Sequence, residues 1–252
     1  MTIIIISLLL LASLLPQLTF TAHVNVGIVK GREAEPHSRP YMVSLQTCGY
    51  HTCGGFLIYD QFVLTAAHCW TGCELLTAVV GAHDLRNSIS SDSIRVMSYI
   101  PHPNYTTNPV QNDIMLLRLE KKVKLNNNVG LITIPKEGEN VEAGTPCSVA
   151  GWGDLETDGN GSHVLMEANT TIKHPDTCVS AWGTKFLDSQ MICVEGGGGG
   201  SCRGDSGGPL VCEGKAVGVT SFGSPEHCSS DKLPEVYTKV SAFRQWIDKV
   251  LK

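Results

Sequence analysis

Short apolar runs separated by turn-forming residues recur along the chain from residue 28 onward. Each run is only a few residues long, which is too short for a typical helix and typical of a strand between turns. No long amphipathic helix interrupts the series, so the pattern predicts an all-β fold. The strand-like runs are 42–45, 56–58, 62–64, 78–80, 115–119, 148–150, 209–211 and 216–220.

The C-terminal stretch has a different period. Its apolar residues fall on one face of a helix. We therefore expect a C-terminal helix that packs on the β domain through Val240, Phe243, Ile247, Val250 and Leu251.

The N-terminal stretch 3–20 is almost wholly apolar. This is typical of a secretory signal peptide, which we expect to end near residue 22, and a retained membrane anchor is the alternative. No other segment has the apolar length needed to span a membrane, so no membrane contact is expected after processing.

Length and composition narrow the function classes. A chain of 252 residues suits one large domain or two small ones, and a net charge of −5 gives no indication of nucleic acid binding. Ten cysteines in a secreted chain predict disulfides, although the sequence alone leaves their pairing open. Asn104, Asn160 and Asn169 each begin an N-glycosylation sequon.

Three motifs carry candidate chemistry. Ser206 lies in Gly-Asp-Ser-Gly-Gly-Pro, His68 in Thr-Ala-Ala-His-Cys and Asp113 in Asn-Asp-Ile-Met-Leu-Leu. A serine hydroxyl is a weak nucleophile that needs a base and an orienting acid. Each motif alone has a structural interpretation, but all three in the order His, Asp, Ser indicate a nucleophilic triad.

These motifs make the chain resemble the chymotrypsin-like serine proteases over residues 28–252. The resemblance implies peptide-bond hydrolysis of protein or peptide substrates. It also implies two six-stranded antiparallel barrels with the active site between them, a boundary near 126–134 and a C-terminal helix. It rests on 28–29, 65–69, 113–117, 151–153, 204–210 and 234–240.

The resemblance also implies a role for each residue of the motifs. Ser206 attacks the scissile carbonyl, His68 transfers the proton and Asp113 orients the imidazole. The backbone amides of Gly204 and Ser206 form the oxyanion hole. Removal of a short propeptide, 23–27, exposes Ile28, whose amino group pairs with Asp205.

The implied disulfide pairs are Cys53–Cys69, Cys147–Cys212, Cys178–Cys193 and Cys202–Cys228. Cys48 and Cys73 are left over. Each lies just outside the Cys53–Cys69 pair, so a fifth bridge between them is the interpretation, with two free thiols as the alternative.

The residue before Ile28 is Gly27, so a trypsin-like activator has no basic residue to recognise. This feature, together with 36–42, 53–58 and 81–85, resembles the branch of granzymes, mast-cell proteases and cathepsin G. That branch implies secretion or granule storage, activation by a dipeptidyl peptidase and control by serpin-type inhibitors. The negative net charge argues against a proteoglycan partner. The alternatives are a digestive-type secreted protease and a catalytically silent binding protein.

The specificity pocket is also inferred from the resemblance. Gly200 corresponds to its floor and Gly223 to its wall, while Ser221 and Phe222 lie beside the substrate. Glu235 would point into the pocket from the side and favour Lys or Arg at P1, with Phe, Tyr or Leu second. The alternative is that Glu235 turns outward or pairs with Arg203 or Lys232. No cofactor or metal is expected, because Asp84 and Asp92 form no calcium-binding loop.

Overall fold

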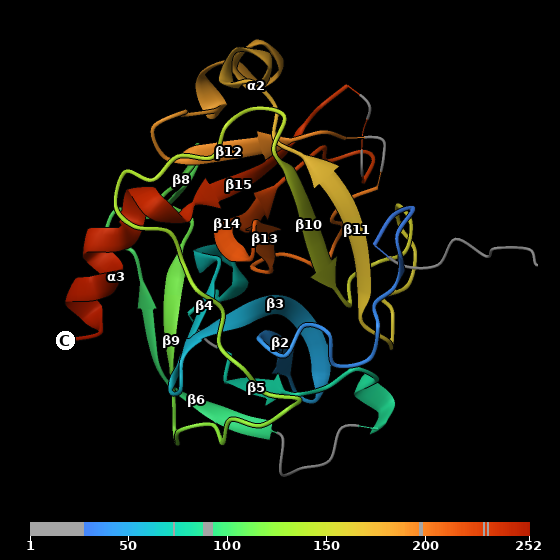
Figure 1. The fold of residues 1–252 in the computed structure, drawn as a ribbon, viewed down its shortest axis with the longest axis vertical. Helices are drawn as coiled ribbons and strands as arrows, with labels where there is room; N and C mark the ends of the chain where they lie inside the picture. The colour runs from blue at the N-terminus through green and yellow to red at the C-terminus, as the bar shows by residue number, and fades with distance from the viewer. Residues whose placement is uncertain (1–27, 73, 88–92, 197–198, 229, 231) are drawn as a thin grey trace, which may run out of the picture.

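The structure is a computed structural model that describes residues 28–72, 74–87, 93–196, 199–228, 230 and 232–252. These residues fold into two β assemblies, which occupy the lower and upper halves of Figure 1. The predicted signal peptide 1–22 and propeptide 23–27 lie outside the described residues, so both stay predictions.

The first assembly is a closed barrel of six antiparallel strands. Its strands carry fully buried apolar side chains on both faces, among them Phe56, Leu57, Leu64 and Leu116. Closure pairs every strand edge, which removes the exposed edges that promote aggregation. In barrel order the strands are β2 (Met42–Thr47), β3 (Tyr50–Tyr59), β4 (Phe62–Thr65), β9 (Met115–Leu119), β6 (Ser93–Pro101) and β5 (Leu76–Val80).

The second assembly is a seven-stranded antiparallel sheet with its own core, which includes Val149, Leu210 and Tyr237. The sheet curls until β11 and β12 approach each other, where Ile172 bridges Val194. In sheet order the strands are β1 (Arg32–Glu33), β11 (Met166–Thr171), β10 (Pro146–Gly151), β13 (Pro209–Cys212), β14 (Lys215–Phe222), β15 (Glu235–Lys239) and β12 (Met191–Val194). The all-β prediction is confirmed.

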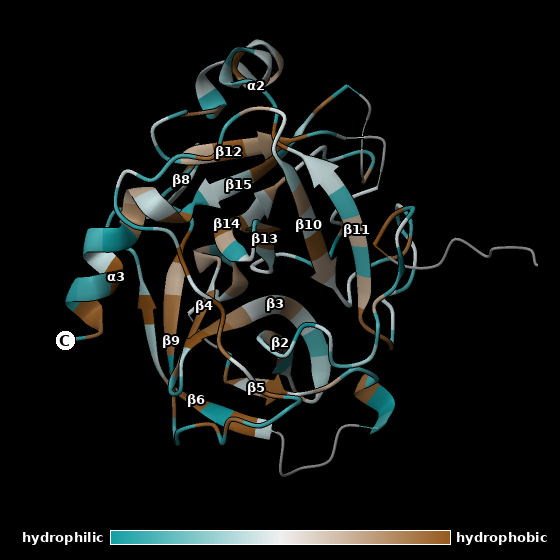
Figure 2. Ribbon diagram, viewed as in Figure 1, coloured by the Kyte–Doolittle hydropathy of each residue, from teal (hydrophilic) through white to brown (hydrophobic). Residues whose placement is uncertain are grey.

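The expected C-terminal helix is α3 (Arg244–Val250), which follows a 3₁₀ turn, Val240–Phe243. Val240, Phe243 and Ile247 are buried against the first barrel, with Val250 and Leu251 partly buried beside them. Figure 2 shows polar and apolar residues alternating along this helix, as one buried face requires. A second helix, α2 (Pro175–Trp182), was not expected from the sequence.

The segment 126–134, where the barrel boundary is predicted, touches both assemblies. The Ile132 amide donates to the Leu57 carbonyl of the first barrel (3.0 Å), and Ala216 of the second sheet donates to the Thr133 carbonyl (3.0 Å). A short hairpin of β7 (Thr106–Thr107) and β8 (Val110–Gln111) leads into Asp113.

The disulfides tie loops to these strands. Cys48 is exposed and has no bridge to a described cysteine, and Cys73 lies outside the described residues, so the fifth bridge stays a prediction. The described cysteines form four bonds, with the pairing that the resemblance implies: Cys53–Cys69, Cys147–Cys212, Cys178–Cys193 and Cys202–Cys228.

Candidate active site

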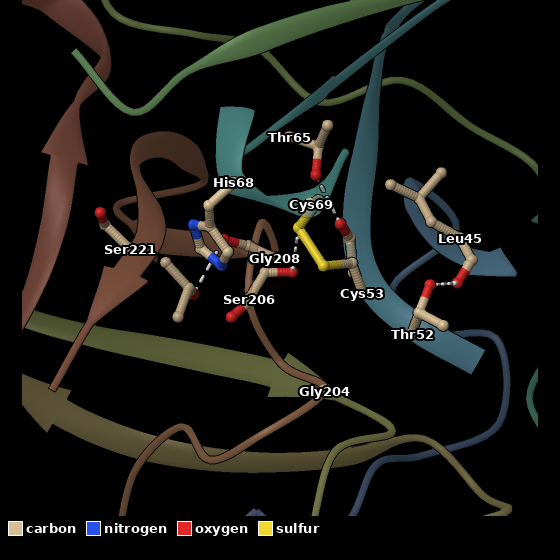
Figure 3. The surroundings of a disulfide bond; sticks show 12 residues. Leu45, Thr52, Cys53, Thr65, His68, Cys69, Gly204, Ser206, Gly208 and Ser221 are labelled. Atoms are coloured by element: carbon tan, nitrogen blue, oxygen red, sulfur yellow. Dashed lines mark hydrogen bonds between the residues drawn. A yellow bond between two sulfur atoms is a disulfide. The ribbon is translucent and has the colours of Figure 1, made fainter. Parts of the chain in front are cut away.

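His68 lies in a single 3₁₀ turn, Ala67–Cys69, that follows strand β4. The Cys53–Cys69 disulfide fixes the end of this turn to β3, as Figure 3 shows. The Thr65 hydroxyl donates to the Gly54 carbonyl (2.8 Å) and fixes its start. The imidazole is therefore held by a short, cross-linked segment and not by a long loop.

Asp113 lies just before strand β9, which begins at Met115, and is 1% exposed. Its Oδ1 accepts the backbone amide of His68 (3.0 Å), and its Oδ2 accepts His68 Nδ1–H (2.7 Å). The Ser221 hydroxyl donates to the same Oδ2 (2.5 Å). Both carboxylate oxygens thus have donors, which favours the anion despite its burial.

The carboxylate determines which nitrogen of His68 is basic. A carboxylate only accepts, so Nδ1 carries the proton and Nε2 keeps its lone pair. Burial lowers the pKa of His68, but the hydrogen bond and the charge of Asp113 outweigh burial and leave this pKa above its ordinary value. The ring is thus a stronger base than an isolated imidazole.

Ser206 enters from the second assembly. Its carbonyl accepts the Gly54 amide of the first barrel (2.8 Å), and Figure 3 shows Ser206 beside the His68 ring. Gly207 has a positive φ of 80°, and a β-carbon there would collide with Thr65 and with the Gly54 carbonyl. Glycine is required after the serine because the two assemblies touch at this point.

The amides around Ser206 fall into two groups. Those of Asp205, Gly207 and Gly208 donate to the backbone carbonyls of Cys202, Thr220 and Asp205 respectively. Those of Gly204 and Ser206 donate to no group in the described part of the chain. These two N–H groups are the ones that the resemblance assigns to an oxyanion hole.

His51 supports this loop and was missed by the sequence interpretation. Its Nε2 donates to the Gly204 carbonyl (2.9 Å), so its Nδ1 accepts from the Ser44 hydroxyl (2.8 Å). Burial lowers the pKa of His51 to about 4, although the bond to Gly204 opposes the shift. A neutral imidazole with a hydrogen bond at each nitrogen therefore holds the Gly204 carbonyl in place, two residues before Ser206. No local motif marks this histidine, since the Gly204 carbonyl that it binds lies 153 positions away in sequence.

Asp205 is 2% exposed and accepts two backbone amides, from Gly153 (2.8 Å) and Cys202 (2.9 Å). Burial raises the pKa of Asp205 to about 7, with a smaller contribution from the nearby carboxylate of Glu235. Ile28 is also buried, at 1% exposed, in the core of the second sheet. Residue 27 lies outside the described residues, so the Ile28–Asp205 pair stays a proposal.

Comparison with known proteins fixes the family. A family model described as Trypsin matches residues 28–247. The chain belongs to the trypsin family. It is 40% identical to human cathepsin G over 246 residues, which cover 95% of this chain and 92% of that protein. It is also 40% identical to rat granzyme B over 232 residues (89% of this chain and 91% of the other) and 38% identical to sheep mast cell protease 3 over 234 residues (89% of each).

The fold gives the same result. The structure of mouse neuropsin, a serine protease, superposes with a TM-score of 0.82 at 35% identity and covers 89% of this chain and 100% of its own. This trypsin-family chain is therefore a serine endopeptidase with a chymotrypsin-like fold, as the sequence motifs predict.

A pocket of about 150 Å³ lies on one side of Ser206 in the trypsin-family fold. Glu235, at the start of β15, is 3% exposed and reaches its lining. Arg203 pairs with Asp154 (2.9 Å) and not with Glu235. The remaining lining residues are Ser201, Cys202, Arg203, Thr220, Ser221, Phe222, Gly223, Ser224 and Cys228.

Gly200 does not line this pocket directly, but it explains how Glu235 fits. A β-carbon at residue 200 would overlap Oε1 of Glu235, so the carboxylate occupies the space that a side chain at residue 200 would fill. Phe222 packs edge-on against Trp182 of α2, with ring centroids 5.1 Å apart. Helix α2 thus supports the wall of the pocket.

The other sequence-predicted sites are peripheral. Asn104, Asn160 and Asn169 are all exposed, as glycosylation requires, and their use stays a prediction. Cys53, His68 and Cys69 offer ligand atoms within 4.8 Å of one another, but the two sulfurs are joined in a disulfide and cannot bind a metal ion as thiolates. None of the described helices has the length and apolar character to cross a membrane.

Proposed function

We propose that this endopeptidase cleaves peptide bonds through Ser206, His68 and Asp113. The observation that carries the proposal is the pair of bonds from His68 to Asp113, which fixes the ring and leaves Nε2 basic beside Ser206. Nε2 takes the proton of Ser206 Oγ as the oxygen attacks the scissile carbonyl, and then gives it to the leaving amine. Water hydrolyses the resulting acyl-enzyme by the same steps in reverse.

The amides of Gly204 and Ser206 are proposed to bind the negative oxygen of the tetrahedral intermediate. Their support is that neither has an acceptor within the described residues, whereas the amides between and after them do. Such preorganised donors stabilise the transition state strongly, and loss of one typically lowers the rate by about 10²-fold or more.

We also propose that cleavage before Ile28 activates the enzyme. Asp205 is buried and receives only backbone N–H donors among the described residues, which makes an unpaired anion costly. The new amino group of Ile28 would supply the missing cation. Gly27 favours an activating dipeptidyl peptidase over a trypsin-like activator, and the apolar leader favours secretion or granule storage, with serpin-type inhibitors as expected partners.

For specificity we propose Lys or Arg at P1, then Phe, Tyr or Leu, with Asp and Glu rejected. Support comes from the buried carboxylate of Glu235 at the pocket lining and from the absence of a side chain at Gly200 and Gly223. Attraction between opposite charges is strong in a partly desolvated site. Replacing Glu235 with arginine should abolish cleavage after Lys and Arg.

A peptide library with varied P1 residues tests the proposal. The chain is expressed with an enteropeptidase-cleavable leader that ends immediately before Ile28, and the activated form is compared with Ser206→Ala. Cleavage after Lys or Arg that disappears in the variant supports both triad and pocket. Cleavage only after aromatic or leucine residues keeps the triad and rejects the role of Glu235. If the chain with a confirmed Ile28 terminus cleaves no peptide through Ser206, the triad proposal is wrong.

A further inference from the structure

The two oxygens of the Glu235 carboxyl group have very different surroundings. Oε2 accepts three hydrogen bonds, from the Ser201 amide (2.9 Å), the Ser201 hydroxyl (2.7 Å) and the Tyr237 hydroxyl (2.9 Å). Oε1 is buried and has no hydrogen-bond partner in the described part of the chain. Oε2 thus accepts three hydrogen bonds, and Oε1 accepts none from the described residues.

Among the described residues, no cation forms an ion pair with this carboxyl group, neither Arg203 nor Lys232. On β15 the nearest titratable group is Tyr237, and the residue opposite on β12 is Val194. The loop before Ser206 contributes Asp205, which is itself an acid, and Arg203, whose guanidinium pairs with Asp154. On the β14 side the neighbours are the uncharged residues Phe222 and Gly223.

An anionic oxygen that is buried without a donor is costly, and a proton on the carboxyl group removes most of that cost. Burial raises the pKa of Glu235, although the donors to Oε2 oppose the rise. A P1 lysine or arginine would remove the cost in a different way, because its cation would be the donor that Oε1 lacks. An apolar P1 side chain would leave the proton in place.

We propose that Glu235 carries a proton in the empty pocket and loses it to solvent when a cationic P1 side chain enters, so that pH selects between cationic and apolar substrates. The inference rests on the proposed function, because it assigns the P1 side chain to this pocket. One proton leaves the carboxyl group for each lysine or arginine bound, and none leaves for phenylalanine or leucine. The pocket therefore favours apolar substrates at acidic pH and basic substrates at higher pH.

Two peptide anilides that differ only in P1, Lys against Phe, test this inference. The ratio of their kcat/KM values is measured from about pH 4.5 to about pH 8.5. His68 titrates identically for both substrates, so its effect cancels in the ratio. The ratio should rise about tenfold per pH unit below the pKa of Glu235 and level off above it, because only the ionised fraction binds the cation. A ratio that stays constant over this range overturns the inference.

Variants separate Glu235 from other titrating groups. Glu235→Gln resembles the protonated form, so its ratio should be low and independent of pH. The matched control is Glu142→Gln, an exposed glutamate remote from the pocket, which should keep the full pH dependence. Tyr237→Phe removes one donor to Oε2 and should move the rise to higher pH. A rise that persists unchanged in Glu235→Gln contradicts the inference.

A binding measurement keeps the test independent of catalysis. The Ser206→Ala form is titrated with benzamidine in acetate and in MES, two buffers of the acidic range whose ionisation enthalpies differ. On the acid side of the rise, binding should release close to one proton, and the release should vanish in the Ser206→Ala, Glu235→Gln double variant. Benzamidine binding without proton release at every pH contradicts the role of Glu235, even if the triad is correct. If proton release is seen but the activated chain with Ser206 intact cleaves no peptide, the triad proposal fails and this inference stands.

Discussion

Asp113 and Glu235 are both buried carboxyl groups near Ser221, which donates to Asp113 and lines the pocket that Glu235 reaches. Their hydrogen-bond donors are arranged in opposite ways. Asp113 has a donor at each oxygen: the His68 amide at Oδ1, and the His68 ring and the Ser221 hydroxyl at Oδ2. Glu235 has all its donors at Oε2 and none at Oε1 among the described residues.

This difference in hydrogen bonding suits the two roles that we propose, catalysis for Asp113 and selection of the P1 side chain for Glu235. A carboxylate with donors at both oxygens is held as an anion in one orientation, which suits a group that must hold an imidazole steady through every turnover. A carboxyl group with one buried oxygen that has no donor among the described residues can respond to a cation that enters beside it. We therefore expect changes at Asp113 to affect all substrates equally and changes at Glu235 to affect only cationic ones.

The largest expected effect is that of Asp113→Asn. The amide would present a donor to one position where the carboxylate accepts, so His68 would adopt the wrong tautomer. In this enzyme class such a change lowers kcat by about 10⁴-fold. The loss should be the same for Lys and Phe anilides, with KM little altered. A loss that differs between the two substrates by more than about tenfold would show that Asp113 also shapes selection.

Asp205 is an intermediate case, with two backbone donors and no cation among the described residues. Burial raises its pKa from 3.8 to about 7. Between these values the folded state holds a proton that the unfolded chain has lost, so stability falls as pH rises through this window. Each pH unit costs up to about 1.4 kcal/mol, or about 3 to 5 °C in Tm for a chain of this size.

This pH dependence should be seen in the uncleaved chain, measured by Tm between about pH 4 and about pH 7. Cleavage before Ile28 should abolish it, because the new amino group would stabilise the Asp205 anion. Asp205→Asn provides the control, since an amide does not titrate, and this variant should lose the part of the slope that belongs to Asp205 and keep only the part that belongs to Glu235. Equal slopes for cleaved and uncleaved chains would contradict the Ile28–Asp205 pair.

Gly200→Ala tests how firmly Glu235 is held. The new β-carbon would overlap Oε1, so the carboxyl group must leave its three donors or the strand must shift. Overpacking of this kind costs about 1–3 kcal/mol. Cleavage after Lys should fall by about 10- to 100-fold, with a smaller loss for Phe. Adding Glu235→Ala should recover the lost Tm, and failure to recover it would place the strain elsewhere.

One hydroxyl donor can be removed from each carboxyl group. Ser221→Ala removes the donor to Asp113 Oδ2, and Ser201→Ala removes the hydroxyl donor to Glu235 Oε2. A bond to a charged group contributes about 1.5–3 kcal/mol, so we expect about a tenfold loss of kcat/KM in each case. For Ser221→Ala the loss should fall on both substrates, and for Ser201→Ala on the Lys substrate alone. If both variants lose kcat/KM equally for the Lys and Phe substrates, the distinction between Asp113 and Glu235 is wrong.

The sequence predicted the parts of the molecule that have a local signature. Runs of consecutive apolar residues marked β2, β4 and β9, and the helical period of the last residues marked α3. Strand β11, Met-Glu-Ala-Asn-Thr-Thr, was missed because its buried residues alternate with polar ones and are mostly small or polar themselves. Helix α2 is one short element with a single fully buried residue, Cys178, so its hydrophobic pattern is weak.

The site divides in the same way. Motifs marked His68, Asp113 and Ser206, which the fold brings to one cleft. The roles of His51 and of the unpartnered oxygen of Glu235 could not be predicted, because each depends on contacts between segments distant in sequence. His51 meets Gly204 across 153 positions, and Glu235 meets Ser201 across 34. Only the folded chain shows which oxygen has a donor.

The smallest expected effect concerns Arg203, the one arginine among the described residues of the pocket lining. Its side chain is 74% exposed and pairs with Asp154, so it does not offset the charge of Glu235. Exposed ion pairs of this kind contribute about 0–1 kcal/mol. Arg203→Gln should therefore change the Lys to Phe ratio of kcat/KM by less than about threefold at any pH. A larger rise in that ratio would mean that Arg203 repels cationic substrates.

The pH at which the ratio rises should also stay the same in Arg203→Gln, because Arg203 makes no hydrogen bond to Glu235. A shift of that midpoint would show that the charge of Arg203 acts on Glu235. The choice between Lys and Phe substrates would then depend on Arg203 and Glu235 together, and not on Oε1 of Glu235 alone.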